Sequence, residues 1–113
     1  MPGAFWEDVA ADVRDPDFAR AYAAEAIRIR TVDALVNALN DAASSEGVSR
    51  AEIARAAGMQ PAAVRRLLTA TTVNPTVSTL VEVAAALGFR VTLEKMSTTE
   101  RQEITEPMRI AAA

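Results

Sequence analysis

Four arginines lie between residues 49 and 69 of this 113-residue chain, beside Ser49, Gln60 and Thr69, whose side chains can form hydrogen bonds. Residues 47–69 carry four arginines and one glutamate, a net charge of +3, although the whole chain has a formal charge of −3. A guanidinium group can bind a phosphate, or both acceptor atoms of a guanine edge. A local positive region is the pattern expected where a protein contacts nucleic acid. The acidic remainder predicts weak non-specific affinity, because phosphate contacts supply most of that affinity.

Two short helices joined by a tight turn are the elements that must position these side chains. In the twenty-residue stretch from Arg50 to Thr69, apolar residues stand at the positions that a helix-turn-helix buries: Ile53, Ala57, Met59, Val64 and Leu67. Ala54 is small where the two helices must cross, and Gly58 reaches a positive φ without a Cβ clash. The spacing therefore predicts a helix-turn-helix, whose second helix enters the DNA major groove.

Local capping signals agree with this prediction. Ser49 followed by Glu52 is a capping box, and Val48 with Ile53 forms a hydrophobic staple around the same helix start. Pro61 stands where the second helix must begin, and its missing N–H costs nothing at a first helical position. We therefore expect both helices to begin where these residues stand.

The upstream part of the chain is expected to be helical. The apolar residues of the first 14 positions are spaced for a short helix, and Asp15-Pro16-Asp17 is a typical helix start. Apolar residues then recur every three to four positions until Ala43. Thr31 either begins a fresh helix or interrupts a long one. We divide the chain into an N-terminal helical extension (1–30), a helix-turn-helix domain (31–88), a dimerisation strand (89–96) and a flexible tail (97–113).

The strand prediction comes from alternation. Phe89, Val91 and Leu93 alternate with polar residues, as in a half-buried β-strand. A single strand has no partner within this chain, so we expect it to pair with the same strand of a second copy, giving a homodimer. The tail after it is expected to be mobile, with at most one helical turn begun by Ser97.

Composition excludes most catalytic chemistry. The chain has no histidine and no cysteine, which removes thiolate nucleophiles, disulfides and nearly every zinc site. The acidic cluster of Glu7, Asp8 and Asp12 is better explained as a solvated helix face than as a metal site. We expect no enzyme activity, no cofactor and no metal. Without a membrane-spanning apolar run or a signal-peptide pattern, the expected location is the cytoplasm.

Three segments, DPDFARAY, VSRAEIARAAGM and NPTVSTLVEVAAALGFRVTLE, resemble the lambda-repressor-like (XRE or Cro/C1-type) DNA-binding domains. More narrowly, they are similar to HigA-type antitoxins, and together they span roughly residues 15–95. The resemblance implies an all-α fold of five to six helices with a dimer-forming C-terminal extension. It also implies repression of the protein's own operon at a pseudo-palindromic operator and a complex with a RelE/HigB-like RNase toxin.

By position in the motif, the resemblance implies two sets of DNA contacts. The base contacts would come from Gln60, Ala62, Ala63, Arg65 and Arg66. The phosphate contacts would come from Ser49, Arg50 and Thr69, and Arg55 is a further candidate on charge alone. Three residues depart from the family pattern. Many relatives have Gln at the position of Arg50 and a polar residue at the position of Pro61, and Glu is common at the position of Leu68.

Each of these residues also has a simpler interpretation. The arginines can be ordinary solvated charges, and Ser49 is above all a helix cap. Ala62 and Ala63 contact thymine methyl groups or merely allow the helix to approach DNA closely. The aromatics Phe5, Trp6, Phe18 and Tyr22 either cap the core or form a partner surface, since aromatic residues are frequent hot spots. The alternatives to an antitoxin are a stand-alone or phage-type regulator and a helical protein-interaction adaptor.

Overall fold

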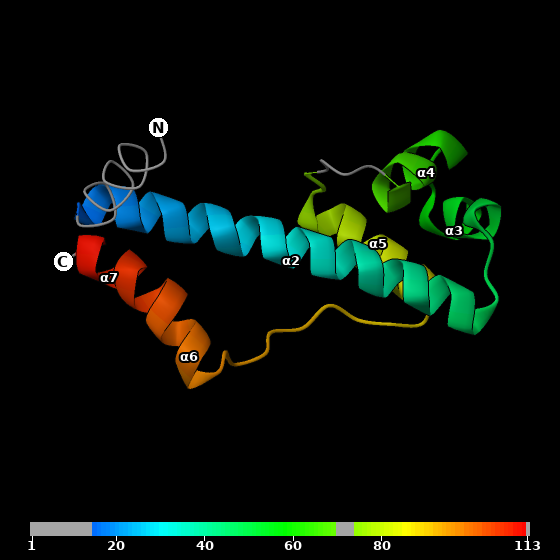
Figure 1. Cartoon of the computed structure of the whole chain (residues 1–113). Helices are drawn as coiled ribbons and strands as arrows, with labels where there is room; N and C mark the ends of the chain where they lie inside the picture. The colour runs from blue at the N-terminus through cyan, green and yellow to red at the C-terminus, as the bar shows by residue number, and fades with distance from the viewer. Residues whose placement is uncertain (1–14, 70–73, 113) are drawn as a thin grey trace, which may run out of the picture. The chain divides into compact units, whose positions relative to one another are not determined.

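The computed structural model describes residues 15–69 and 74–112, and all regular structure in these ranges is helical (Figure 1). The elements in chain order are α2 (Pro16–Glu46), α3 (Arg50–Ala57), α4 (Pro61–Thr69), α5 (Val77–Ala86), α6 (Thr98–Glu100), the π-helical turn η1 (Arg101–Thr105) and α7 (Glu106–Ala112). The all-helical expectation is confirmed for the described residues. The predicted helix of residues 1–14 lies outside them.

The chain forms two compact units, and α2 contributes to both. One unit is Thr31–Leu93, and the other combines the segments on either side of it, described over residues 15–30 and 94–112. Thr31 neither begins a fresh helix nor interrupts a long one, because α2 runs through this residue without a break.

Local signals set both ends of α2. The Asp15 carboxylate accepts a hydrogen bond from the Asp17 N–H at 3.0 Å, and Pro16 occupies the first helical position. At the other end, Gly47 adopts a φ of +64°, and the Val48 N–H donates to the Ala43 carbonyl at 3.0 Å. The expected helix start at Asp15-Pro16 is therefore confirmed, and a glycine turn leads from α2 to α3.

The Thr31–Leu93 unit has a continuous apolar core shared by α2, α3, α4 and α5. Ile53, Val64 and Val83 are completely buried, and each such side chain contributes about 1.5–3 kcal/mol on transfer from water. The other buried members are Leu39, Ala42, Ala54, Leu67, Leu68, Ala84 and Leu87. This core holds α3 and α4 in the arrangement that the apolar spacing predicts.

The predicted strand at residues 89–96 is not supported, because this segment makes no β-ladder within the described chain. Gly88, with a φ of +86°, follows α5, and the Phe89 N–H donates to the Ala84 carbonyl at 2.8 Å. Phe89 and Val91 then line a groove beside α2 and α5. Alternation detects an extended backbone with two different faces, but a strand also requires a hydrogen-bonded neighbour.

The flexible tail predicted for residues 97–113 is also wrong, because the chain is helical from Thr98 to Ala112. Ser97 caps this helix by accepting a hydrogen bond from the Glu100 N–H at 3.1 Å, as expected, but the helix continues far beyond one turn. Ile104 is only 3% exposed, and it lines a groove together with Ala23 of α2. Pro107 argues against a helix in the sequence, because it lacks an N–H. In the structure the wider turn η1 precedes it.

Candidate nucleic-acid interface

The start of α3 is fixed by Ser49 and Glu52. The Ser49 Oγ accepts a hydrogen bond from the Glu52 N–H at 3.2 Å, and the Glu52 carboxylate accepts one from the Ser49 N–H at 3.3 Å. This is the predicted capping box, and it satisfies two N–H groups that would otherwise lack partners. It places Arg50 at the first position of α3, on the exposed surface.

Gly58 makes the turn between α3 and α4. Its backbone has φ +65° and ψ +34°, the left-handed conformation that glycine adopts at low cost. Its N–H points to the carbonyls of Ala54 and Arg55, and the Met59 N–H donates to the Ala54 carbonyl at 2.9 Å. The predicted positive φ is confirmed, and α4 leaves the turn at an angle set by these bonds.

The helix α4 has one buried side and one exposed side. Val64, Leu67 and Leu68 are 0%, 6% and 5% exposed, respectively, and they pack into the core. The opposite side of this helix and its start carry the residues predicted to contact bases: Gln60, Ala62, Arg65 and Arg66, all exposed, and the half-buried Ala63. The structure therefore places all five predicted base-contacting residues on or next to the accessible face of one helix.

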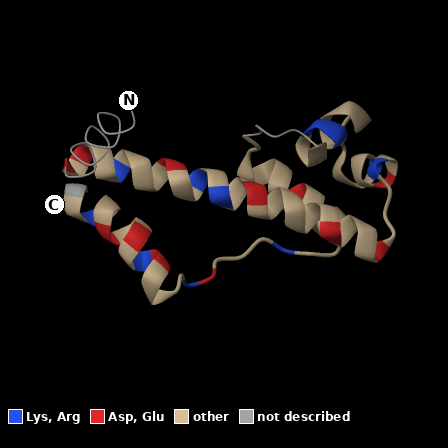
Figure 2. Ribbon diagram, in the orientation of Figure 1, with Lys and Arg blue, Asp and Glu red and all other residues tan. Residues whose placement is uncertain are grey.

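The four arginines of the motif are exposed and lie on α3 and α4 (Figure 2). In the ranges 15–69 and 74–112 the structure has one salt bridge, between Arg28 and Glu25 of α2. There the hydrogen bond and the charge of Glu25 raise the pKa of Arg28 above its ordinary value. Within these ranges no carboxylate forms such a pair with the exposed Arg50, Arg55, Arg65 or Arg66.

The two predicted hydroxyl contacts are already engaged within the protein. The Ser49 Oγ donates to Glu52 Oε1 at 3.1 Å, and the Thr69 Oγ1 donates to the Arg65 carbonyl at 2.6 Å. A phosphate oxygen only accepts hydrogen bonds, so each hydroxyl would have to give up its present partner to contact DNA. The phosphate role of these two residues stays a prediction, whereas Ser49 acts as a helix cap.

Asn40 of α2 is a residue that the motif does not predict. Its Nδ2 donates to the Leu68 carbonyl in the last turn of α4 at 2.9 Å. The sequence signal was weak, since Asn40 is a single polar residue directly after Leu39 in the apolar stripe of α2. The bond links α2 to the exposed helix of the motif.

The structure describes the predicted dimer segment and two of the four aromatic residues of the predicted partner surface. Phe89 and Val91 are 49% and 43% exposed, and Leu93 is fully exposed. In the other unit, the rings of Phe18 and Tyr22 stack with centroids 6.2 Å apart, and both side chains reach the surface. Phe5 and Trp6 lie outside the described residues.

The helices α3 and α4, joined by the left-handed Gly58 turn and carrying exposed arginines, form a helix-turn-helix. Residues 45–93 match the helix-turn-helix family model HTH_3. The match covers α3, α4 and α5, so it supports a helix-turn-helix in this part of the chain. No curated protein and no solved structure matches the chain. None of the described helices is long and apolar enough to cross a membrane.

Proposed function

We propose that the protein is a sequence-specific transcriptional repressor that places α4 in the major groove of its operator. The observation that carries this proposal is the two-sided character of α4. Val64, Leu67 and Leu68 anchor it to the core, while Arg65 and Arg66 extend into solvent from the other side. Repression then follows from occupation of the promoter, and no catalytic step is involved.

Arg65 and Arg66 make different contacts with DNA in this proposal. Adjacent residues on a helix diverge by about 100°, so the two guanidinium groups cannot reach the same part of DNA. One contacts a guanine edge, which provides about 1–3 kcal/mol of base discrimination, and the other contacts phosphate. Ala62 and Ala63 add little bulk, so the helix backbone can approach the bases closely.

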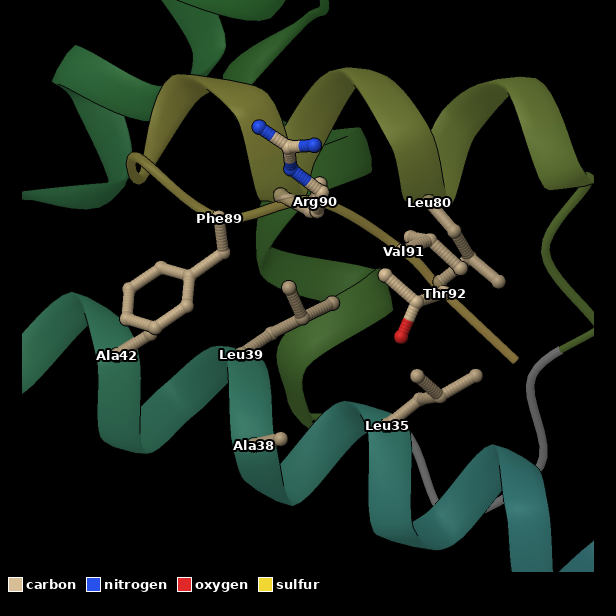
Figure 3. A pocket seen from close by; sticks show the side chains of 10 residues that line it. Leu35, Ala38, Leu39, Ala42, Leu80, Phe89, Arg90, Val91 and Thr92 are labelled. Carbon is tan, nitrogen blue, oxygen red and sulfur yellow. The ribbon is translucent and has the colours of Figure 1, made fainter. Parts of the chain in front are cut away.

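We further propose that two copies bind together, with the apolar segment at Phe89, Val91 and Leu93 in the interface. This segment passes a groove of about 290 Å³ whose apolar walls include Leu35 and Leu80 (Figure 3). Leu93 is fully exposed and follows directly after the residues that line this groove. In a two-fold dimer the same surface of each copy contacts the other, so we propose that this segment and groove of one copy pack against the same segment and groove of a second copy. The pair would set the two α4 helices about 34 Å apart on a pseudo-palindromic site.

The more specific role that we propose is that of an antitoxin, which represses its own operon and neutralises a RelE/HigB-like RNase toxin. Its support is the similarity of the segments around the motif to HigA-type antitoxins. The stacked pair of Phe18 and Tyr22 is exposed on the unit that does not carry the motif, and we propose it as the surface for this protein partner. A stand-alone regulator would have the same DNA-binding unit and no such partner.

The deciding experiment is fluorescence anisotropy of the full chain with two duplexes, its own upstream DNA and a scrambled sequence of equal length. Measurements at about 50 and 200 mM salt separate phosphate contacts from base contacts. Preference for the native duplex, with affinity that falls as salt rises, supports the repressor. Equal affinity for the two duplexes contradicts it. Co-purification from the native host with a small, basic toxin encoded next to this gene separates the antitoxin from the stand-alone regulator.

A further inference from the structure

Asn40 joins the backbone of α2 to the backbone of α4 through one side-chain amide. Its Nδ2 donates to the Val36 carbonyl of its own helix at 3.1 Å and to the Leu68 carbonyl of α4 at 2.9 Å. An amide NH₂ group has two hydrogens, so both of its donors are used. The first bond holds the side chain in one rotamer, and the second passes that constraint to α4.

The acceptor on α4 is a carbonyl that the helix itself leaves without a partner. The last four carbonyls of a helix have no N–H group to bind within the helix, and Leu68 is one residue from the end of α4. Asn40 is half-buried, so its bond to this carbonyl is partly shielded from competition with bulk water. The contact is therefore a directional link at the C-terminal end of the exposed helix.

Core packing constrains α4 in a different way from the hydrogen bond between Asn40 and Leu68. Val64, Leu67 and Leu68 hold the helix against the core through apolar contacts, which depend on buried area and have no preferred direction. A hydrogen bond depends on distance and angle, so it opposes sliding and rotation of the helix about its axis. Recognition of base edges needs side chains placed within about 0.5 Å of their productive geometry.

We propose that Asn40 is a positioning residue that sets the axial position and the rotation of α4, and through it the discrimination between DNA sequences. Asn40 itself touches no DNA in this proposal, which rests on the proposed function of α4 as the recognition helix. Discrimination between sequences should depend on Asn40 more than non-specific affinity does, because phosphate contacts tolerate small displacements better than bidentate base contacts do.

The test compares Asn40→Ala with Asn37→Ala, a matched change at an exposed residue of the same helix. Urea denaturation first establishes conditions in which both variants are fully folded. Anisotropy then measures binding to the native upstream duplex and to the scrambled duplex. We expect Asn40→Ala to lose about tenfold in affinity for the native duplex, the equivalent of one weakened base contact. Its affinity for the scrambled duplex and its salt dependence should remain those of the wild type, and Asn37→Ala should match the wild type throughout.

A parallel loss on both duplexes would overturn the proposal, because a merely structural role lowers all binding together. Should Asn40→Ala fail to fold, the wild-type chain still provides a test by NMR. The side-chain amide hydrogens of Asn40 should exchange with solvent much more slowly than those of Asn37, and equal exchange would overturn the link. A wild-type protein without preference for its native duplex overturns the proposed function as well. A wild-type preference that survives Asn40→Ala overturns this inference alone.

Discussion

Ser49 and Glu52 cap the first helix of the motif reciprocally, each accepting a hydrogen bond from the backbone N–H of the other. In addition, the Ser49 hydroxyl donates to the Glu52 carboxylate at 3.1 Å. A residue predicted to contact phosphate therefore has its hydroxyl hydrogen committed to a carboxylate. Stability and DNA binding can be separated at this position by mutation.

Ser49→Ala should lower the free energy of unfolding by about 1 kcal/mol, because the Glu52 N–H loses its cap. Urea denaturation of the full chain measures this change. Ser78→Ala, at an exposed position within α5, is the control and should leave stability unchanged or slightly higher. A variant with unchanged stability and much weaker DNA binding would assign Ser49 to phosphate contact rather than to capping.

Gly58→Ala should destabilise the protein by about 1–2 kcal/mol, the cost of a side chain in the left-handed region. A Cβ built on Gly58 meets no atom within 4 Å, so the loss arises from backbone strain and not from a clash. Thermal unfolding measures the effect, with Ala56→Gly as a helix-interior comparison for the loss of a Cβ. An unchanged midpoint for Gly58→Ala would show that the turn relaxes without cost.

Arg65→Ala and Arg66→Ala should each weaken binding to the native upstream duplex while changing the stability by less than about 0.5 kcal/mol. The arginine at the bases should lose about 1–3 kcal/mol of discrimination, and the arginine at phosphate should reduce the salt dependence instead. Anisotropy at two salt concentrations distinguishes the two results. Arg20→Ala, an exposed arginine of α2 outside the motif, is the control. Loss of binding in proportion to loss of fold would refute the surface assignment.

Leu93→Asp should convert the proposed dimer to a monomer, because two buried carboxylates would face each other across a two-fold interface. Light scattering of the full chain measures the mass directly. Glu94→Lys, a charge change at the exposed neighbour of Leu93 that belongs to the alternate, polar set of the segment, should leave the dimer intact. A Leu93→Asp protein that stays dimeric would place the interface elsewhere.

The helix-turn-helix could be predicted from sequence because its determinants are local. Ser49, Glu52 and Gly58 act through bonds or torsions within four residues of themselves, so the order of residue types is sufficient. The burial of Val64 and Leu67 follows from their spacing, since a helix repeats every 3.6 residues whatever surrounds it. The location of the exposed arginines on α3 and α4 follows from the same geometry.

Tertiary structure decided the features that depend on residues far apart in the chain. Asn40 and Leu68 are 28 positions apart, and no local pattern shows that an amide on one helix meets the last turn of another. The segment after Gly88 alternates like a strand, but the described chain gives it no hydrogen-bonded neighbour. The chain is helical from Thr98 to Ala112, although Pro107 disfavours a helix there in the sequence. Burial of Ile104 stabilises this helix in the folded protein. Local preferences select helices and caps, whereas burial and long-range hydrogen bonds select which segments stay together.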